Sequence, residues 1–224
     1  RVDLESGQRQ SIRPGDPTGA IGPRKNWTTW QDLDAPEQRL GNAMAPANWD
    51  GPFLISPHDP DVLYLGGNKL FRTTDRGESW EEMSGDLTRN ETPSEWEIMG
   101  LKPSLRPYNA LSAVAESPLR QGLIYVGADD GSVHRTTDGG ETWELVNFVS
   151  DKAGFVELVI HPEDPEVLWA ASWERVRGPW FLQSGGPGSA LWKTTDGGDS
   201  WERLQPEGFP DSMLGRIGLD ISRS

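Results

Sequence analysis

Residues 73–80 read TTDRGESW, and the same pattern returns as TTDGGETW at residues 136–143 and as TTDGGDSW at residues 194–201. The aspartates in the third position of these boxes are Asp75, Asp138 and Asp196, which are spaced by 63 and then 58 residues. A motif that returns at intervals of this size indicates a chain built from copies of one supersecondary unit. The predicted fold follows from this repeat.

Each box ends a longer repeated unit. Residues 53–64 (FLISPHDPDVLY) parallel residues 158–169 (LVIHPEDPEVLW), and residues 113–125 are a looser copy. Each copy predicts an apolar strand, a Pro-containing turn and a second strand. A third strand then enters the box, and a fourth follows its tryptophan. Four short antiparallel strands, repeated radially, make a β-propeller blade.

The sequence therefore predicts an all-β fold of three complete blades plus partial ones. Propellers close with about four to eight blades, so we expect part of a larger propeller, closed by further blades or copies. The expected divisions are a partial blade tail and Pro/Gly-rich insert (1–49), a blade with a long connector (50–107), a blade (108–150), a blade with a long loop between its second and third strands (151–212), and the start of a further blade (213–224).

Box residues have roles that a turn requires. We expect Asp75, Asp138 and Asp196 to accept backbone N–H bonds within their own turns, and Gly77, Gly140 and Gly198 to adopt positive φ. We expect Trp80, Trp143 and Trp201 to begin the outer strands and to direct the indole N–H at a carbonyl. Because identical copies in every blade cannot converge on one site, we interpret the boxes as folding devices rather than calcium ligands or catalytic acids.

The box pattern resembles that of Asp-box, or bacterial neuraminidase repeat, proteins, a set that includes sialidases, xyloglucan hydrolases, sortilin and photosystem assembly factors. Residues 53–90, 115–138 and 184–224 also resemble large bacterial sortilin-like, or VPS10-type, repeat proteins that are often labelled glycosyl hydrolases. This resemblance implies a secreted or cell-envelope protein. In those proteins the GGPGS blade precedes the SPHDP blade, whereas here it follows. A permutation, or two segments joined near Leu145 to Phe148, is a hypothesis that accounts for this order.

Composition excludes several classes of function. The net charge of −14 makes nucleic acid a poor partner, because backbone binding needs Lys and Arg against phosphates. There is no cysteine, and there are three histidines, so we expect no disulfide, no metal site and no cofactor. No run approaches the roughly 20 apolar residues of a membrane-spanning helix, so we expect no membrane insertion.

Candidate ligand-binding residues lie in long segments at the rim opposite the boxes. Between the second and third strands of the third blade the sequence carries Trp173, Arg175, Arg177 and Trp180, and the connector after the first blade carries Trp96 and Arg106. Indole rings suit sugars or apolar peptide side chains, and guanidinium groups suit carboxylates. The alternatives are a self-packed loop with its arginines paired, and a solvated connector.

Another candidate is Asp129-Asp130-Gly131, which suits either a cation or, as we expect, a tight hairpin.

We expect a binding or scaffold propeller that recognises a peptide, protein or glycan on this rim. The first alternative is a carbohydrate-active hydrolase with paired carboxylates, and the second is a purely architectural subunit. A sialidase needs a tyrosine nucleophile. Tyr64 and Tyr125 fall on packing positions of the second strand, which leaves Tyr108 as the one remaining candidate for that nucleophile.

Overall fold

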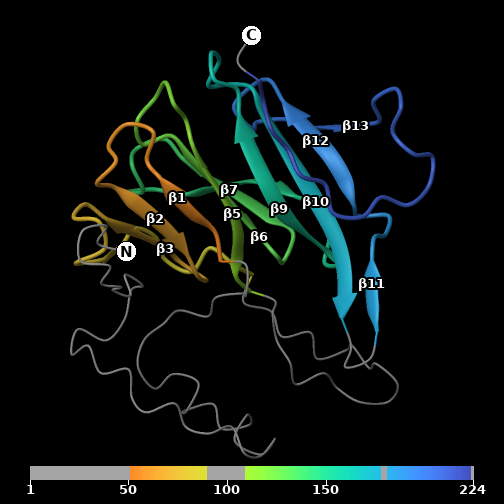
Figure 1. The fold of residues 1–224 in the computed structure, drawn as a ribbon, viewed down its shortest axis with the longest axis horizontal. Coiled ribbons are helices and arrows are strands. Elements are labelled where there is room, and N and C mark those ends of the chain that lie inside the picture. Colours follow the sequence, from red (N-terminus) through yellow and green to blue (C-terminus); the bar gives the residue numbers. More distant parts are fainter. Residues whose placement is uncertain (1–50, 90–108, 178–180, 223–224) are drawn as a thin grey trace, which may run out of the picture.

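The computed structural model describes residues 51–89, 109–177 and 181–222, and within them every regular element is a β-strand (Figure 1). The strands are β1 (Phe53–Ile55), β2 (Leu63–Gly66), β3 (Leu70–Thr73), β4 (Glu81–Glu82), β5 (Leu111–Glu116), β6 (Ile124–Ala128), β7 (Ser132–Thr136), β8 (Glu144–Phe148), β9 (Ala153–Ile160), β10 (Leu168–Arg177), β11 (Leu182–Ser184), β12 (Ala190–Thr194) and β13 (Glu202–Leu204). Among the described residues no helix is long and apolar enough to cross a bilayer.

These strands form three consecutive propeller blades. Blade 1 is the antiparallel sheet β1-β2-β3-β4, and blade 2 is β5-β6-β7-β8. In blade 3, β10 pairs with β9 on one side and with β12 on the other, and β13 completes the sheet. Each blade has four antiparallel strands in an up-and-down order, and blade 3 adds β11 as a fifth, so the predicted all-β propeller-blade fold is confirmed.

Blade 3 differs from the expectation in one place. The segment that we expected to be a long loop is largely a two-stranded extension, because β10 continues to Arg177 and pairs with β11 in the register Arg175↔Ser184 and Arg177↔Leu182. Trp173 and the β-branched Val176 favour an extended strand, and β11 supplies the backbone partner. The hypothetical join at Leu145 to Phe148 falls inside β8, which pairs with β7.

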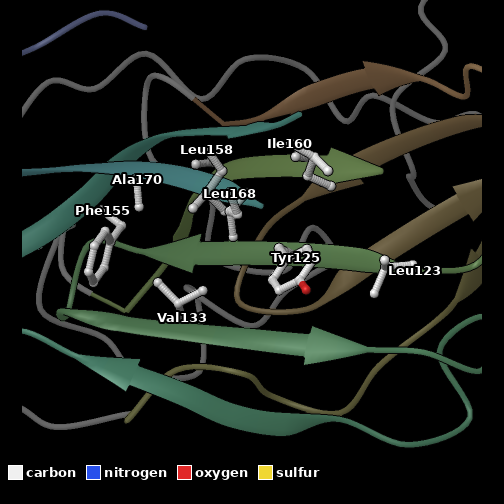
Figure 2. Packing of buried hydrophobic residues seen from close by; sticks show 10 residues of the cluster. Leu123, Tyr125, Val133, Phe155, Leu158, Ile160, Leu168 and Ala170 are labelled. Atoms are coloured by element: carbon white, nitrogen blue, oxygen red, sulfur yellow. The ribbon is translucent and has the colours of Figure 1, made fainter. Parts of the chain in front are cut away.

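The core lies between blades rather than within one sheet. Blades 2 and 3 enclose the cluster Ala113, Ala115, Leu123, Tyr125, Val133, Phe155, Leu158, Ile160, Leu168 and Ala170, with five residues from each blade (Figure 2). The sheets approach closely because a Cβ on Gly127 would lie 2.8 Å from the Cβ of Phe155. Tyr125 reaches across this interface and donates its hydroxyl to the carbonyl of Gly197 at 2.8 Å. A similar cluster joins blades 1 and 2.

Each blade therefore has a front face, which we define as the sheet face turned toward the preceding blade. In blade 3 the front face includes Leu158 and Ile160, each 7% exposed against blade 2. The strand registers Ile55↔Leu63 and Ile160↔Leu168 place Phe53 and Ile55 at the same positions in blade 1. These two side chains are 51% and 53% exposed, so the front face of blade 1 is open at β1, although Leu63 opposite Ile55 is buried.

All three boxes form the turns that the sequence predicts. Ser79, Thr142 and Ser200 each donate the backbone N–H to the box aspartate at 2.9–3.0 Å. Gly77, Gly140 and Gly198 have φ of 90°, 97° and 102°. The indole N–H of Trp143 donates to the carbonyl of Met83, and that of Trp201 donates to the carbonyl of Gly198. The outer strands begin one residue after each tryptophan, at Glu81, Glu144 and Glu202.

Candidate functional site

The rim opposite the boxes carries the β6–β7 turn and the β10–β11 extension. In blade 2 the turn is tight, with the N–H of Gly131 bonded to the carbonyl of Ala128 and with Gly131 at φ 96°. Gly154, near the start of β9, packs against this turn so closely that a Cβ would lie 2.4 Å from the Cα of Asp129. The turn of blade 2 and the first strand of blade 3 thus meet at this rim.

Two adjacent carboxylates occupy the turn. Asp129 accepts the backbone N–H groups of Asn109 and Ala110 at 2.8 and 2.9 Å. Asp130 is buried and accepts the N–H of Arg89 and both the N–H and the hydroxyl of Ser132. These bonds are what a closed hairpin needs, so the expected structural role of Asp129-Asp130-Gly131 accounts for the contacts.

Asp129 nevertheless has an unusual acidity. Burial, with a smaller contribution from the charge of Asp130, raises its pKa to about 7 against the opposing effect of the two N–H bonds. The charge of Arg175 acts in the opposite direction. A carboxyl group with a pKa near neutrality can carry a proton at mildly acidic pH, which is the property that a general acid requires.

Trp173 lies on β10 beside two arginines. The guanidinium of Arg175 is 5.0 Å from the centroid of the indole, and that of Arg216 is 5.8 Å away. The indole N–H donates to the hydroxyl of Ser184 on β11 at 3.1 Å. Cation–π contacts at these distances hold the ring in one orientation. The result is an aromatic ring flanked by positive charge in a chain whose net charge is −14.

Glu174, the next residue, points to the other face of β10 and is 8% exposed. Its carboxylate accepts the N–H of Gly188 at 3.0 Å, and its backbone bonds Ser189 and Gly185. A Cβ on Gly186 would lie 2.2–2.6 Å from that carboxyl group, so a larger residue here would displace the Glu174 carboxylate. Glu174 thereby fixes the turn that connects β11 to β12.

Of the predicted ligand residues, the structure brings Trp173 and Arg175 together. Arg177 ends β10, where its backbone pairs with Leu182. Trp180, Trp96 and Arg106 lie outside the described residues. Sequence reasoning missed the contribution of Arg216, and it considered Asp129 as a turn residue or a cation ligand but not as an acid. No local signal marks Arg216, because it reaches Trp173 from a distant part of the chain.

Histidines and tyrosines take structural positions. His161 occupies the position that Ser56 has in blade 1 and Ser117 has in blade 2, because the backbone N–H of each bonds the equivalent turn. The Nδ1 of His161 accepts the N–H of Glu163, and the two serine hydroxyls accept the corresponding N–H groups in their own blades. Burial raises the pKa of Tyr125 to about 12. Among the described residues no group of three or more His, Asp or Glu side chains is arranged to hold a metal ion.

Comparisons with known proteins give distant and partial matches. No family model matches the sequence. The chain is 31% identical over 136 residues to xyloglucanase Xgh74A of Acetivibrio thermocellus, and 30% identical over 131 residues to a xyloglucanase of Paenibacillus sp.. Each match covers 53% of this chain, which spans 15% and 12% of the length of these relatives. An ancestral GH74 enzyme is a similar solved structure, with a TM-score of 0.49, 20% identity, and coverage of 72% of this chain and 19% of that chain.

Proposed function

We propose that this chain is part of a carbohydrate-active propeller that acts on a xyloglucan-type β-glucan, with the ligand bound at the rim of Asp129, Trp173 and Arg175. The observation that carries the proposal is the sequence similarity to two xyloglucanases over more than half of this chain. This similarity favours the hydrolase that the sequence offered as an alternative over the binding scaffold that we expected first. A polysaccharide substrate also agrees with the secreted location that the resemblance implies.

The rim offers chemistry that suits a glycan. Trp173 provides an indole edge and face beside the donors of Arg175 and Arg216, and sugars bind through this combination of ring contact and hydrogen bonds. In a hydrolase, Asp129 would protonate the glycosidic oxygen, since its pKa of about 7 leaves it largely protonated at pH 5–6. Asp130 and Glu174 are buried, whereas Asp129 is partly exposed, so we assign no step to the first two.

Binding is tested with the full chain by affinity electrophoresis in gels that contain xyloglucan, with dextran as the polysaccharide control. We expect xyloglucan to retard the chain and the Trp173→Ala variant to bind at least about tenfold more weakly, as loss of an aromatic hot spot does. Phe53→Ala is the matched control, because Phe53 is an exposed aromatic on the open face of blade 1. Equal retardation by dextran, or equal binding by Trp173→Ala, would reject the proposed rim.

Hydrolysis is tested by the release of reducing ends from xyloglucan. We expect Asp129→Asn to lower turnover by about 10²-fold or more, the usual contribution of a general acid, with binding retained. Asp211→Asn, at an exposed position, is the control. Binding without any turnover would favour the scaffold function instead, and the absence of both would exclude a carbohydrate-active role.

The raised pKa of Asp129 also predicts a dependence of stability on pH. Because the folded pKa of about 7 lies above the unfolded value, ionisation of Asp129 weakens the fold progressively from about pH 4 to pH 7. Asn mimics the protonated acid, so the free energy of unfolding of Asp129→Asn should not carry this loss. Its difference from the wild-type value should therefore shift in favour of the variant by roughly 2–4 kcal/mol between pH 4 and pH 8. Urea unfolding at both pH values measures this. A difference that does not change with pH would contradict the raised pKa.

A further inference from the structure

Gly154 lies where the first strand of blade 3 packs against the β6–β7 turn of blade 2. A Cβ on Gly154 would lie 2.4 Å from the Cα of Asp129 and 2.7 Å from its carbonyl carbon and oxygen. All three atoms belong to the backbone, which cannot rotate aside as the end of a long side chain can. A larger residue at this position would therefore have to move the turn itself.

The strand register places this contact on the same sheet face as two of the proposed glycan-binding residues. Gly154 pairs directly with Trp173, and residues directly opposite each other in an antiparallel pair direct their Cβ atoms to one face. Because side chains alternate along a strand, Arg175 shares that face, and its charge acts on Asp129. The backbone of Asp129 thus fills the space that a side chain on Gly154 would occupy beside Trp173.

The next pair on the same two strands supports this assignment of faces. Ala153 pairs with Glu174, and a Cβ on Gly188 would lie 2.7 Å from the Cβ of Ala153 and 3.2 Å from a carboxylate oxygen of Glu174. These two side chains therefore share the opposite face, where they pack against the turn between β11 and β12. Gly154 and Trp173 consequently face the β6–β7 turn.

Other contacts confine the β6–β7 turn from its remaining sides. Asp129 accepts the N–H groups of Asn109 and Ala110, which lie before β5. A Cβ on Gly131 would lie 2.3 Å from the carbonyl oxygen of Ser150, so the far end of the turn is also in close contact. A side chain inserted from β9 would therefore change both the surroundings of the Asp129 carboxyl group and its separation from the indole.

We propose that Gly154 is a positioning residue that sets how closely the carboxyl group of Asp129 approaches Trp173 and Arg175. The inference rests on the function proposed above, in which Asp129 protonates a glycan that is held at this rim. The missing side chain lets the turn reach the face that carries the aromatic ring, and the same close approach helps to bury the carboxyl group. Gly154 acts through Asp129 and takes no part in the chemistry itself.

The surroundings of Asp129 give the direction of the expected effect. Burial is the largest cause of its raised pKa, Asp130 on the same turn adds to it, and Arg175 on β10 opposes it. The segments around this rim also carry the charged residues Arg89, Asp151, Lys152, Glu174 and Arg216. A methyl group on β9 would move the turn outward and admit water, so the pKa of Asp129 should fall toward its ordinary value.

Stability measures the effect on Asp129 without any glycan. The wild type and Gly154→Ala are unfolded with urea at pH 4 and pH 8, in about 1 M sucrose so that a destabilised variant stays folded. Ionisation of Asp129 weakens the wild-type fold between these pH values, and a lower folded pKa reduces that loss. The free energy of unfolding of Gly154→Ala relative to the wild type should therefore shift in favour of the variant from pH 4 to pH 8. The shift should be absent when both chains carry Asp129→Asn.

The pH profile of xyloglucan hydrolysis measures the effect on the reaction. Turnover falls as pH rises through the pKa of a general acid, so the alkaline limb for Gly154→Ala should lie at least about one pH unit below that of the wild type. Binding of xyloglucan should stay within about threefold of the wild-type value, because Trp173 keeps its hydrogen bond to Ser184.

Gly140→Ala is the matched control for overpacking, because a Cβ there would lie 2.7 Å from the side chain of Met83, at the rim of the boxes. It should lose stability but keep the wild-type pH profile and the wild-type dependence of stability on pH. Absence of either shift in an active Gly154→Ala chain, the same shifts in Gly140→Ala, or a Gly154→Ala chain that is unfolded even in sucrose would overturn the proposal. A wild type that does not hydrolyse xyloglucan would reject the proposed function, whereas a stability shift in Gly154→Ala would still support its action on Asp129.

Discussion

At the residue scale, the threonine that opens each box organises the turn together with the aspartate. Thr136 is 1% exposed, donates its hydroxyl to Asp138 at 2.7 Å and accepts the N–H of Gly140 at 2.9 Å. Thr73 and Thr194 make the same bonds in the other boxes. The box is thus a buried threonine and an outward carboxylate that together satisfy the backbone of a turn with positive φ.

Thr136→Val should destabilise the chain by roughly 1–3 kcal/mol, because it keeps the shape but leaves the N–H of Gly140 without its acceptor. Thr137→Val is the matched control, since the adjacent Thr137 is exposed, and it should change stability by less than about 0.5 kcal/mol. Urea unfolding followed by tryptophan fluorescence measures both. Equal effects at the two positions would mean that the hydroxyl of Thr136 is not needed.

At the element scale, short strands gain their stability from the neighbouring blade. β1 has three residues and β4 has two, too few to hold a sheet by their own ladders. The buried clusters instead join β5–β7 to β9 and β10, and β2–β3 to β5 and β6. Equivalent front-face residues therefore contribute differently to the free energy of unfolding, depending on whether a neighbouring blade covers them.

This difference predicts unequal costs for the same substitution. Ile160→Asp places a charge between blades 2 and 3 and should cost at least about 3 kcal/mol, whereas Ile55→Asp, on the open front face, should cost less than about 1 kcal/mol. Thermal unfolding of the two variants beside the wild type provides the comparison. A large loss for Ile55→Asp would show that another part of the chain covers the front face of blade 1.

At the scale of the whole molecule, the carboxylates of the three boxes make the stability of the fold depend on pH. Hydrogen bonds from Thr142 and Thr136 hold the pKa of Asp138 well below its usual range, Ser79 and Thr73 do the same for Asp75, and Ser200 and Thr194 lower that of Asp196 to about 2. A depressed folded pKa contributes stability that is fully present above the unfolded value, near 4, and is lost as pH falls toward the folded value.

The melting temperature should therefore fall as the pH is lowered from about 4.5 to 2.5. Asp138→Asn should melt lower than the wild type at pH 6, and its melting temperature should fall less on acidification because one of the three boxes no longer titrates. Asp211→Asn, exposed and outside the boxes, should follow the wild type. Parallel acid profiles for wild type and Asp138→Asn would contradict this role for the box carboxylates.

The repeat, the strand order within each blade and the turn chemistry follow from the order of the amino acids alone. Eight consecutive residues contain both the hydrogen-bond donors and the acceptors of a box, so its structure is local and can be predicted from the sequence. The same holds for the packing role of Tyr125, which occupies the aromatic position of the second strand in a repeated unit and is fully buried.

The arrangement of side chains at the rim and the exposure of each blade face depend on contacts between segments that are distant in the sequence. Arg216 meets Trp173, and Asn109 bonds Asp129, because chain folding brings together segments that no spacing rule connects. The raised pKa of Asp129 arises from burial by its surroundings, and the extension of β10 depends on a partner, β11, further along the chain. Ile55 is exposed and Ile160 is buried because blade 2 packs against Ile160, whereas no described blade packs against Ile55. This difference comes from the assembly of the blades and not from either residue.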